Sequence, residues 1–426
     1  MPYSFEWTPA AGLDDPGSQI PGASPSQTTT YTVRVTDRLG SIAQASAIVT
    51  VSRVPAGCDP ICPYLDTDAG TSHRPLALRV GDVDGDGLPD VVLLARSHDP
   101  LLNTHHVFVM PNVNRFGTLT FRWEQQLDAT ATGAMDVADV NGDGRADVIV
   151  AIDRAGVSGI AILLSNGDGT FQAPLVLDTG AGSVGEVLVA RVNGDASQDI
   201  VFFSDSASSL SSTVAALLQD ATGNFVQTSA GSILPRPVDR VSRSVVTLDV
   251  DGDSNLDVVA STGLDSSVVL YGDGTGRFVF DPLVNGLLVG APLLTADVTG
   301  DDRPDLIGRA AVDRIGVVVG IAGGFGAVSR FPMDSGAAGR LALADLNGDG
   351  LLDLLVTDAT ETFPLAMLPG DGVGFGAALP LPQQFAFGQS PLDVAVTDLN
   401  GDGYDDVITS VSFGGTPILL SAVRPQ

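Results

Sequence analysis

Short apolar segments alternate with turns of Gly, Asp and Asn along most of the chain. Runs such as Val91–Leu94, Val148–Val150 and Leu354–Val356 are aliphatic and are bounded by turn-forming residues. Segments of this length with such boundaries predict buried β-strands, because helices need longer periodic stretches. No apolar run reaches the roughly 18 residues that a membrane-spanning helix requires. The pattern therefore predicts an all-β fold and no membrane span.

The polar positions follow a nine-residue pattern that joins two of these strands. In Asp345–Asp353, side-chain oxygens fall at positions one, three, five and nine, and Gly348 and Gly350 allow a tight turn. A period near fifty residues is typical of propellers and solenoids. The pattern occurs seven times, starting at Asp82, Asp139, Arg191, Asp249, Asp297, Asp345 and Asp398, with successive starts 57, 52, 58, 48, 48 and 53 residues apart.

Each repeat shares further landmarks after its polar loop. A second apolar run leads to a turn that ends in Phe, as in Ile162–Phe171, and a fourth strand follows. Four short strands per repeat are typical of one propeller blade. The last repeat lacks its fourth strand, whereas Pro63–Gly70 resembles the fourth strand Pro174–Ala181. We therefore predict a seven-bladed β-propeller of four-stranded blades over residues 63–426, whose last blade is completed by the N-terminal strand and has no free edge.

Residues 1–55 form a separate piece. Tyr31, Val33 and Val35 alternate with polar residues, and Arg38–Gly40 reads as the turn of a β-hairpin. The piece resembles only half of a bacterial PKD/Ig-like sandwich, so we expect Trp7 to lack part of its cover. Residues 56–62 form a linker that contains the two cysteines, Cys58 and Cys62. We interpret them as a small disulfide in an oxidising compartment and not as a two-thiol metal site.

The loops resemble a known repeat family. The Asp-x-Asn-Gly-Asp-Gly-x-x-Asp pattern, with Phe-Gly-Ala at 325–327 and 375–377 and Phe-Gln-Ala-Pro at 171–174, is similar to FG-GAP/VCBS repeats. These repeats resemble the propeller of integrin α subunits and of many secreted bacterial proteins. Residues 1–55 look similar to the second half of bacterial PKD/Ig-like modules. The resemblance implies calcium in the loops and a protein ligand on the opposite face.

Converging oxygen ligands at this spacing suit a hard divalent cation such as Ca²⁺. The alternative is that each loop is only an Asp/Gly turn, since such turns favour the same residues. We predict about six Ca²⁺ ions, held by side chains at positions one, three, five and nine and by the carbonyl at position seven. The predicted ligands are Asp82, Asp84, Asp86, Leu88, Asp90, Asp139, Asn141, Asp143, Arg145, Asp147, Asp249, Asp251, Asp253, Asn255, Asp257, Asp297, Thr299, Asp301, Arg303, Asp305, Asp345, Asn347, Asp349, Leu351, Asp353, Asp398, Asn400, Asp402, Tyr404 and Asp406.

Three loops depart from the pattern. Thr299 stands at position three of the fifth loop and weakens that site, and Ser254 replaces a glycine in the fourth. In the third loop Arg191 replaces the first carboxylate. We expect its guanidinium to fill that site and to pair with Asp195 or Asp199, so that no ion binds there.

The net charge limits the possible partners, and the calcium loops indicate the location of the protein. The chain carries 51 acidic and 21 basic residues, for a net charge of −30. We expect no nucleic-acid partner, because phosphate binding requires a basic surface. Calcium loops indicate a secreted or cell-surface protein. The N-terminus shows no signal peptide, which we interpret as truncation of a longer polypeptide.

Candidate chemistry outside the loops is sparse. No Gly-x-Ser-x-Gly, phosphate-loop or His-Glu-x-x-His motif occurs, so we expect no enzyme. Ca²⁺ with a nearly full oxygen shell is structural rather than catalytic. His98, His105 and His106 could meet and hold a transition metal, although solvated loop histidines are more frequent. Asp153 and Asp205 could serve as a catalytic carboxylate pair, but nothing in the sequence indicates that they lie close together.

Strand geometry places the acidic loops and the Phe turns on one face. The loops Ser97–His106 and Ser204–Thr213 lie on the other, where binding loops are expected. We predict an extracellular, calcium-binding, non-catalytic module for adhesion or recognition of a protein or cell-surface ligand. One alternative is a carbohydrate-binding propeller, for which aromatics are scarce at 6% and Tyr271 and Tyr404 lie on the loop face. The other is part of a secreted polysaccharide-degrading enzyme.

Overall fold

The computed structural model shows two compact units, Met1–Cys58 and Asp59–Gln426. Cys58 lies outside the described residues, and nothing is described of the Cys62 side chain, so the predicted disulfide is not tested. The structure describes residues 3–11, 13, 15–19, 21, 29–38, 40–49, 61–66, 73–97, 104–112, 123–154, 156–180, 182–205, 211–228, 232–235, 244–262, 266–280, 289–311, 313–333, 338–358, 365–381, 391–399, 401, 403–411 and 417–422.

The first unit contains a three-stranded antiparallel sheet. Its order is β1-β2-β3, with β1 (Tyr3–Thr8), β2 (Thr29–Asp37) and β3 (Ile42–Val49). The predicted turn lies between β2 and β3, where Gly40 has a φ of 81°. Tyr31 is buried, and its hydroxyl donates to the carbonyl of Ala11. Trp7 is half-buried and its indole N–H donates to the Ser18 carbonyl at 3.0 Å, so the segment after β1 supplies cover that we expected Trp7 to lack.

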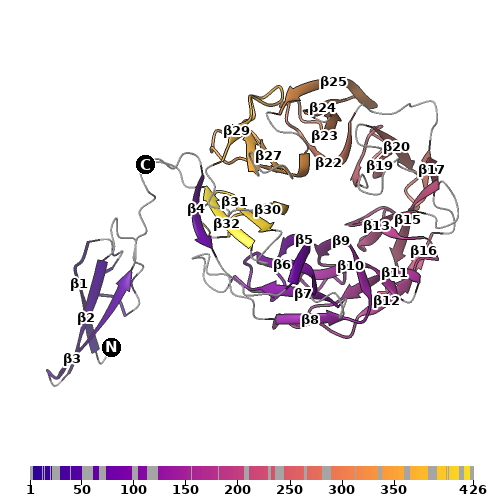
Figure 1. Ribbon diagram of the computed structural model, residues 1–426. Coiled ribbons are helices and arrows are strands. Elements are labelled where there is room, and N and C mark those ends of the chain that lie inside the picture. The colour runs from indigo at the N-terminus through magenta and orange to yellow at the C-terminus, as the bar shows by residue number, and fades with distance from the viewer. Residues whose placement is uncertain are drawn as a thin grey trace. The chain divides into compact units, whose positions relative to one another are not determined.

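In the part of the second unit that the structure describes there are seven antiparallel sheets, which we number blades one to seven (Figure 1). Blade one is β5 (His73–Gly81), β6 (Asp90–Ser97), β7 (His105–Met110) and β8 (Trp123–Leu127); blade two is β9 (Thr130–Ala138), β10 (Asp147–Arg154), β11 (Val157–Leu163) and β12 (Leu175–Asp178); blade three is β13 (Val184–Ala190), β14 (Asp199–Asp205), β15 (Ser211–Gln219), β16 (Phe225–Gln227) and β17 (Ser232–Pro235); blade four is β18 (Val245–Leu248), β19 (Asp257–Ser261), β20 (Ser267–Gly272) and β21 (Phe278–Phe280).

The remaining blades follow the same order along the chain. Blade five is β22 (Gly290–Ala296), β23 (Asp305–Ala311), β24 (Arg314–Ile321) and β25 (Gly324–Pro332); blade six is β26 (Ala338–Ala344), β27 (Asp353–Asp358), β28 (Leu365–Leu368) and β29 (Leu379–Pro380); blade seven is β30 (Pro391–Thr397), β31 (Asp406–Val411), β32 (Pro417–Ala422) and β4 (Ile61–Asp66). The prediction of an all-β, propeller-like fold is confirmed, but blade three departs from the predicted four strands because β17 pairs with β15 as a fifth. The described residues contain no helix of the length and apolarity that crossing a bilayer requires.

Blade seven joins the two ends of this unit. Its outermost strand is β4, which pairs with β32 in the register Ile418 with Asp66 and Ala422 with Ile61. A strand from before the first repeat thus completes the last sheet, as the sequence predicted. The first strands of successive blades lie next to one another in the order β5, β9, β13, β18, β22, β26 and β30, and β30 lies next to β5. Figure 1 shows the resulting ring of sheets.

Hydrophobic cores form between neighbouring blades. One cluster joins Ile149 and Ile160 of blade two to Phe202 of blade three, and another joins Leu93 and Phe108 of blade one to residues of blade seven. Because each sheet is covered on both faces, its second strand is buried along most or all of its length, as in β10 up to Ile152 and in β14 throughout. This two-sided cover explains why these strands read as continuous apolar runs and not as alternating ones.

Polar contacts join blade seven to blade one. The Oδ2 atom of Asp393 accepts the backbone N–H of Leu78 at 2.9 Å and a guanidinium N–H of Arg79 at 3.2 Å. The side-chain amide of Asn112 donates to the carbonyl of Leu399 at 2.6 Å. Asp393 and Asn112 are both buried. These bonds link residues about three hundred positions apart in the sequence and hold the two ends of the ring of sheets together.

Candidate metal sites

Position nine of every loop is a fully buried aspartate that anchors the loop. In loop one, Oδ2 of Asp90 accepts the N–H of Val83 and Oδ1 accepts that of Asn112, just after the third strand. Asp147 repeats both bonds with Val140 and Ser165. The acidic loop and the turn after the third strand therefore share one edge of the blade, as predicted. The anchoring aspartates are Asp90, Asp147, Asp199, Asp257, Asp305, Asp353 and Asp406.

Position one organises the tip of the loop. Asp82 accepts the N–H of Gly85 at 2.7 Å through Oδ1 and that of Gly87 at 2.8 Å through Oδ2. Both glycines have positive φ, which the tight turn requires. Ser254 and Asp302 occupy the Gly87 position in loops four and five with φ of 70° and 63°. The hydrogen bond from the backbone N–H of position six to the carboxylate of position one recurs in five more loops, at Asp139, Asp249, Asp297, Asp345 and Asp398.

The carboxylate at position five accepts a hydrogen bond from the backbone N–H of position seven. Leu88 donates to Asp86 at 2.8 Å, and Leu351 donates to Asp349 at 2.9 Å. The same bond is made by Arg145, Asn255 and Arg303. The loop backbone therefore wraps around its carboxylates and holds them close together. Such an arrangement stabilises the turn, and it also presents several oxygens to one point.

The predicted ligands converge in two loops. One oxygen from each of Asp82, Asp84 and Asp86 lies within 4.8 Å of the others, and the same holds for Asp249, Asp251 and Asp257. Loop one brings together positions one, three and five, and loop four brings together positions one, three and nine. Carboxylate oxygens are the ligands that Ca²⁺ prefers, so these donor sets fit that ion.

Burial and crowding make the ionised carboxylates unfavourable without a cation. Burial raises the pKa of Asp90 and of Asp147 to about 6, although backbone N–H donors partly offset it. Burial, together with the neighbouring Asp86, also raises the pKa of Asp84. A bound cation would reverse these effects, because it favours the charged form of its ligands.

We expect the calcium-free protein to become more stable as the pH falls from 7 to 5. The pKa of Asp90 and Asp147 is about 6 in the folded chain and about 4 when unfolded, so the stability linked to them is complete below pH 4 and is lost as the pH rises through 6. Glu186, whose pKa burial raises to about 7, acts in the same direction. Hydrogen bonds from Thr222 lower the pKa of Asp220 to about 2, outside this range.

Thermal melts at pH 5, 6 and 7, with and without a chelator, measure this dependence. With calcium present we expect the opposite slope, because protons then compete with the ion for carboxylates. Equal slopes in the two conditions would show that no cation occupies the loops.

Arginines approach the carboxylates of loops two and five. A guanidinium nitrogen of Arg145 lies 2.5 Å from Oδ2 of Asp143, and one of Arg303 lies 3.5 Å from Oδ2 of Asp301. Both arginines stand at position seven, where only the backbone carbonyl was predicted to act. In loop five, the Thr299 hydroxyl is buried and has no hydrogen-bond partner among the described residues. A cation in that loop would supply one.

Loop three differs from its prediction. Arg191 is exposed and, in the described part of the chain, makes no ion pair with Asp195 or Asp199. It borders a surface hollow of about 680 Å³ beside Asp139 and Asp220. Asp199 is already occupied by the N–H groups of Val192 and Gln219, and Asp195 by those of its own loop. The predicted filling of the site by the guanidinium was therefore wrong.

The backbone of loop three supplies a second reason to expect no ion. Position six is Ala196, whereas every other loop has a positive φ there and the Asp at position one accepts its N–H. Without a carboxylate at position one, no acceptor holds the backbone in that conformation. The sequence showed Ala196, but its consequence depends on this hydrogen bond.

A carboxylate at position one and a glycine at position six should together create a calcium site in loop three. We expect the double variant Arg191→Asp, Ala196→Gly to bind one more Ca²⁺ per chain than the wild type, by elemental analysis after equilibrium dialysis. Arg191→Asp alone should gain less, because alanine disfavours positive φ by roughly 1–2 kcal/mol. No gain in the double variant would contradict the assignment of positions one and six.

Several predicted residues lie outside the described part of the chain. These are Asn400 and Asp402 of loop seven, residues 98–103 of the Ser97–His106 loop, and 206–210 of the Ser204–Thr213 loop. Asp153 accepts the N–H of Gly156, and Asp205 is buried and accepts the Ser212 hydroxyl. Both carboxylates thus have structural hydrogen bonds.

The edge opposite the acidic loops carries paired arginines in blade one. Arg74 of β5 and Arg96 of β6 are directly opposed in the register and both are exposed. Among the described residues neither forms an ion pair. Like charges directly opposed in a sheet are destabilising, so the pair attracts anions. Sequence reasoning missed it, because register brings together residues 22 positions apart.

The ring of sheets and its acidic edge define a propeller-like repeat protein. The FG-GAP-like repeat family matches residues 82–150, 139–202 and 345–409. The chain therefore contains FG-GAP-like repeats, as its loops predicted. These matches do not extend to the PKD-like segment and do not distinguish an integrin-like propeller. A search of curated proteins returned no significant match.

Solved structures share the fold at low sequence identity. Rhamnogalacturonan lyase PL11 of Bacillus licheniformis is 11% identical with a TM-score of 0.53, covering 99% of this chain and 85% of that one. BBS1N in complex with ARL6DN is 10% identical with a TM-score of 0.54, covering 87% and 99%. A humanized Polycomb Repressive Complex 2 mutant of Chaetomium thermophilum is 9% identical with a TM-score of 0.50, covering 88% and 99%. Such likeness establishes the fold alone.

Proposed function

We propose that this chain is a calcium-stabilised β-propeller that acts outside the cell as a non-catalytic recognition module. The observation that supports it most is the convergence of carboxylate oxygens in loops one and four, in a pattern repeated around one edge of the ring. Each bound ion would neutralise carboxylates that otherwise repel one another. Calcium at such sites is useful where its concentration is high, which favours a secreted or cell-surface location.

The opposite edge is the proposed binding surface. Calcium on the loop side would leave this edge free for a partner. Arg74 and Arg96 give it local positive charge in a protein whose net charge is −30. Guanidinium groups bind carboxylates through paired hydrogen bonds. The partner is therefore an anionic one: an acidic protein segment, or a glycan that carries carboxylates.

The alternatives are weaker. A groove that stacks neutral sugars on aromatic side chains is less favoured, because aromatic residues are scarce at 6%. The similar structure of a rhamnogalacturonan lyase raises the enzyme alternative, but Asp153 and Asp205 have structural hydrogen bonds. We therefore retain a protein or acidic glycan as partner and propose no enzymatic activity.

The test is binding of the calcium-saturated chain to an array of neutral and uronic-acid glycans and to immobilised extracellular proteins. Arg74→Gln, Arg96→Gln should lower binding at least tenfold, since two charge-assisted bonds are each worth about 1.5 kcal/mol or more. Arg277→Gln is the matched control, because Arg277 is exposed in the turn between β20 and β21 on the loop edge. If both variants bind as the wild type does, the arginine pair is not the binding site. Shortening of polysaccharides in a substrate panel would favour the enzyme alternative.

A further inference from the structure

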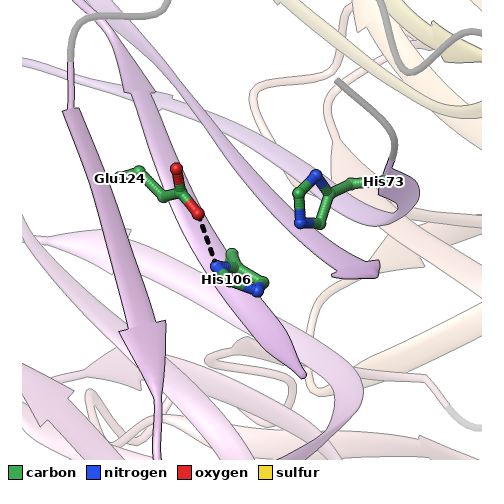
Figure 2. A group of neighbouring side chains, drawn as sticks. All are labelled: His73, His106 and Glu124. Atoms are coloured by element: carbon green, nitrogen blue, oxygen red, sulfur yellow. Dashed lines mark ion pairs between the residues drawn. The ribbon is translucent and has the colours of Figure 1, made fainter. Parts of the chain in front are cut away.

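Two histidines and a glutamate from three strands of blade one meet near the edge opposite the acidic loops (Figure 2). His73 begins β5, His106 lies in β7 and Glu124 lies in β8. One nitrogen of each histidine and one oxygen of Glu124 lie within 4.8 Å of one another. Nδ1 of His106 is 2.7 Å from Oε1 of Glu124.

The register explains why these side chains share a face. His106 is opposite Ala95, and His73 is opposite Ser97, two residues further along the same strand. Glu124 is opposite Phe108, two residues after His106. Alternation therefore points all three toward the face that packs with blade seven, where Phe108 joins a core cluster with Leu399. His105 points to the other face, so the expected meeting of His105 with His106 does not occur.

One nitrogen of each histidine lacks a hydrogen-bond partner among the described residues. Nδ1 of His73 and Nδ1 of His106 are both buried and form no hydrogen bond with the described residues. The short approach of His106 to Glu124 is thus a contact between a nitrogen and a carboxylate oxygen without hydrogen-bond geometry. On its other side, Nε2 of His106 bonds to the Thr104 hydroxyl at 2.9 Å. When Nε2 carries the proton, Nδ1 presents a lone pair to the cluster.

We propose that His73, His106 and Glu124 form a binding site for a divalent transition-metal ion of the zinc class. Two imidazoles and one carboxylate are a donor set that Zn²⁺ accepts, with water in a fourth position. The bond from Thr104 to the second nitrogen of His106 is the kind of outer contact that orients a ligating histidine. Ca²⁺ prefers oxygen donors, so the site is chemically distinct from the acidic loops.

The geometry requires side-chain adjustment. Donors bound at about 2.1 Å around a tetrahedral ion lie about 3.4 Å apart. The three atoms lie within 4.8 Å of one another, and Nδ1 of His106 lies 2.7 Å from Oε1 of Glu124. Side-chain rotation brings them to that spacing, and the half-exposed Glu124 has room to rotate. Its exposure also gives an ion a path from solvent.

Zinc titration of the full, calcium-saturated chain tests the site, with Co²⁺ absorption reporting the ligands. We expect one Zn²⁺ per chain and a visible cobalt band. His106→Ala and Glu124→Gln should weaken zinc binding at least about 100-fold, and Thr104→Val about tenfold. Glu124→Gln keeps the size of an exposed side chain, so it measures the ligand and not the fold.

Control variants distinguish zinc binding at this site from a packing role of the histidines and from calcium binding in the acidic loops. Arg277→Gln, in the turn between β20 and β21, leaves all three ligands in place and should bind zinc as the wild type does. Asp82→Asn should lower calcium content without changing the cobalt spectrum. Absence of zinc binding, or equal zinc binding in Glu124→Gln and wild type, would overturn the proposal. The histidines would then serve only to pack on Phe108, whose ring centroid lies 5.1 Å from that of His73.

Discussion

Removal of calcium should lower the melting temperature of this protein by more than about 20 °C. A site occupied at 100 times its Kd stabilises the fold by about 2.7 kcal/mol, so six sites supply roughly 16 kcal/mol. In a unit of this size each kcal/mol changes the melting temperature by about 2 °C. The physical source is the group of carboxylates that each loop holds together, as in Asp82, Asp84 and Asp86.

Calorimetry with and without EDTA, with bound metal counted by elemental analysis, measures this effect. Re-addition of Ca²⁺ should restore the melt, whereas Mg²⁺ should do so poorly because it demands tighter octahedral geometry. Asp313→Asn serves as the control variant, since Asp313 is an exposed acid outside the loops. An unchanged melt with little bound metal would mean that the loops are only hydrogen-bonded turns. The propeller-like fold would remain.

Replacement of Asp393 by Ala should destabilise the propeller unit by about 3–5 kcal/mol, the range for breaking a buried charged contact. Asp393 is buried, accepts the N–H of Leu78 and a guanidinium N–H of Arg79, and lies 3.7 Å from the guanidinium of Arg340. Its loss leaves a buried donor unsatisfied at the junction of blades seven and one. Hydrogen exchange should therefore rise first in β30 and β5.

Urea unfolding in saturating calcium measures the change. Asp393→Asn should lose less, because the amide oxygen still accepts the Leu78 N–H while the charge is gone. The matched control is Asp313→Ala, whose partner Arg314 lies 3.9 Å away on the surface, and it should change stability by less than about 0.5 kcal/mol. Equal losses at Asp393 and Asp313 would show that the junction of the ring does not depend on this carboxylate.

The acidic loops were accessible from the sequence because their chemistry is local. Positions one to nine are covalent neighbours, so the spacing that defines Asp82, Asp84 and Asp86 also brings their oxygens together. What the sequence did not indicate is how the carboxylates are used. Asp90 anchors the turn after the third strand through the N–H of Asn112, and this contact depends on the folded sheet.

By itself, the sequence determined the all-β class, the repeat, and the strand from the start of this unit that completes its last sheet. These depend on periodic apolar runs and short loops, which each segment of the chain carries locally. Only the tertiary structure decided the contacts between strands. Register and blade packing together produce four features that the sequence did not show. These are the exposed Arg191, the contacts of Asp393 between blades seven and one, the Arg74–Arg96 pair, and the cluster of His73, His106 and Glu124. Register is set by the burial of whole sheet faces, a property that no single segment of the sequence possesses.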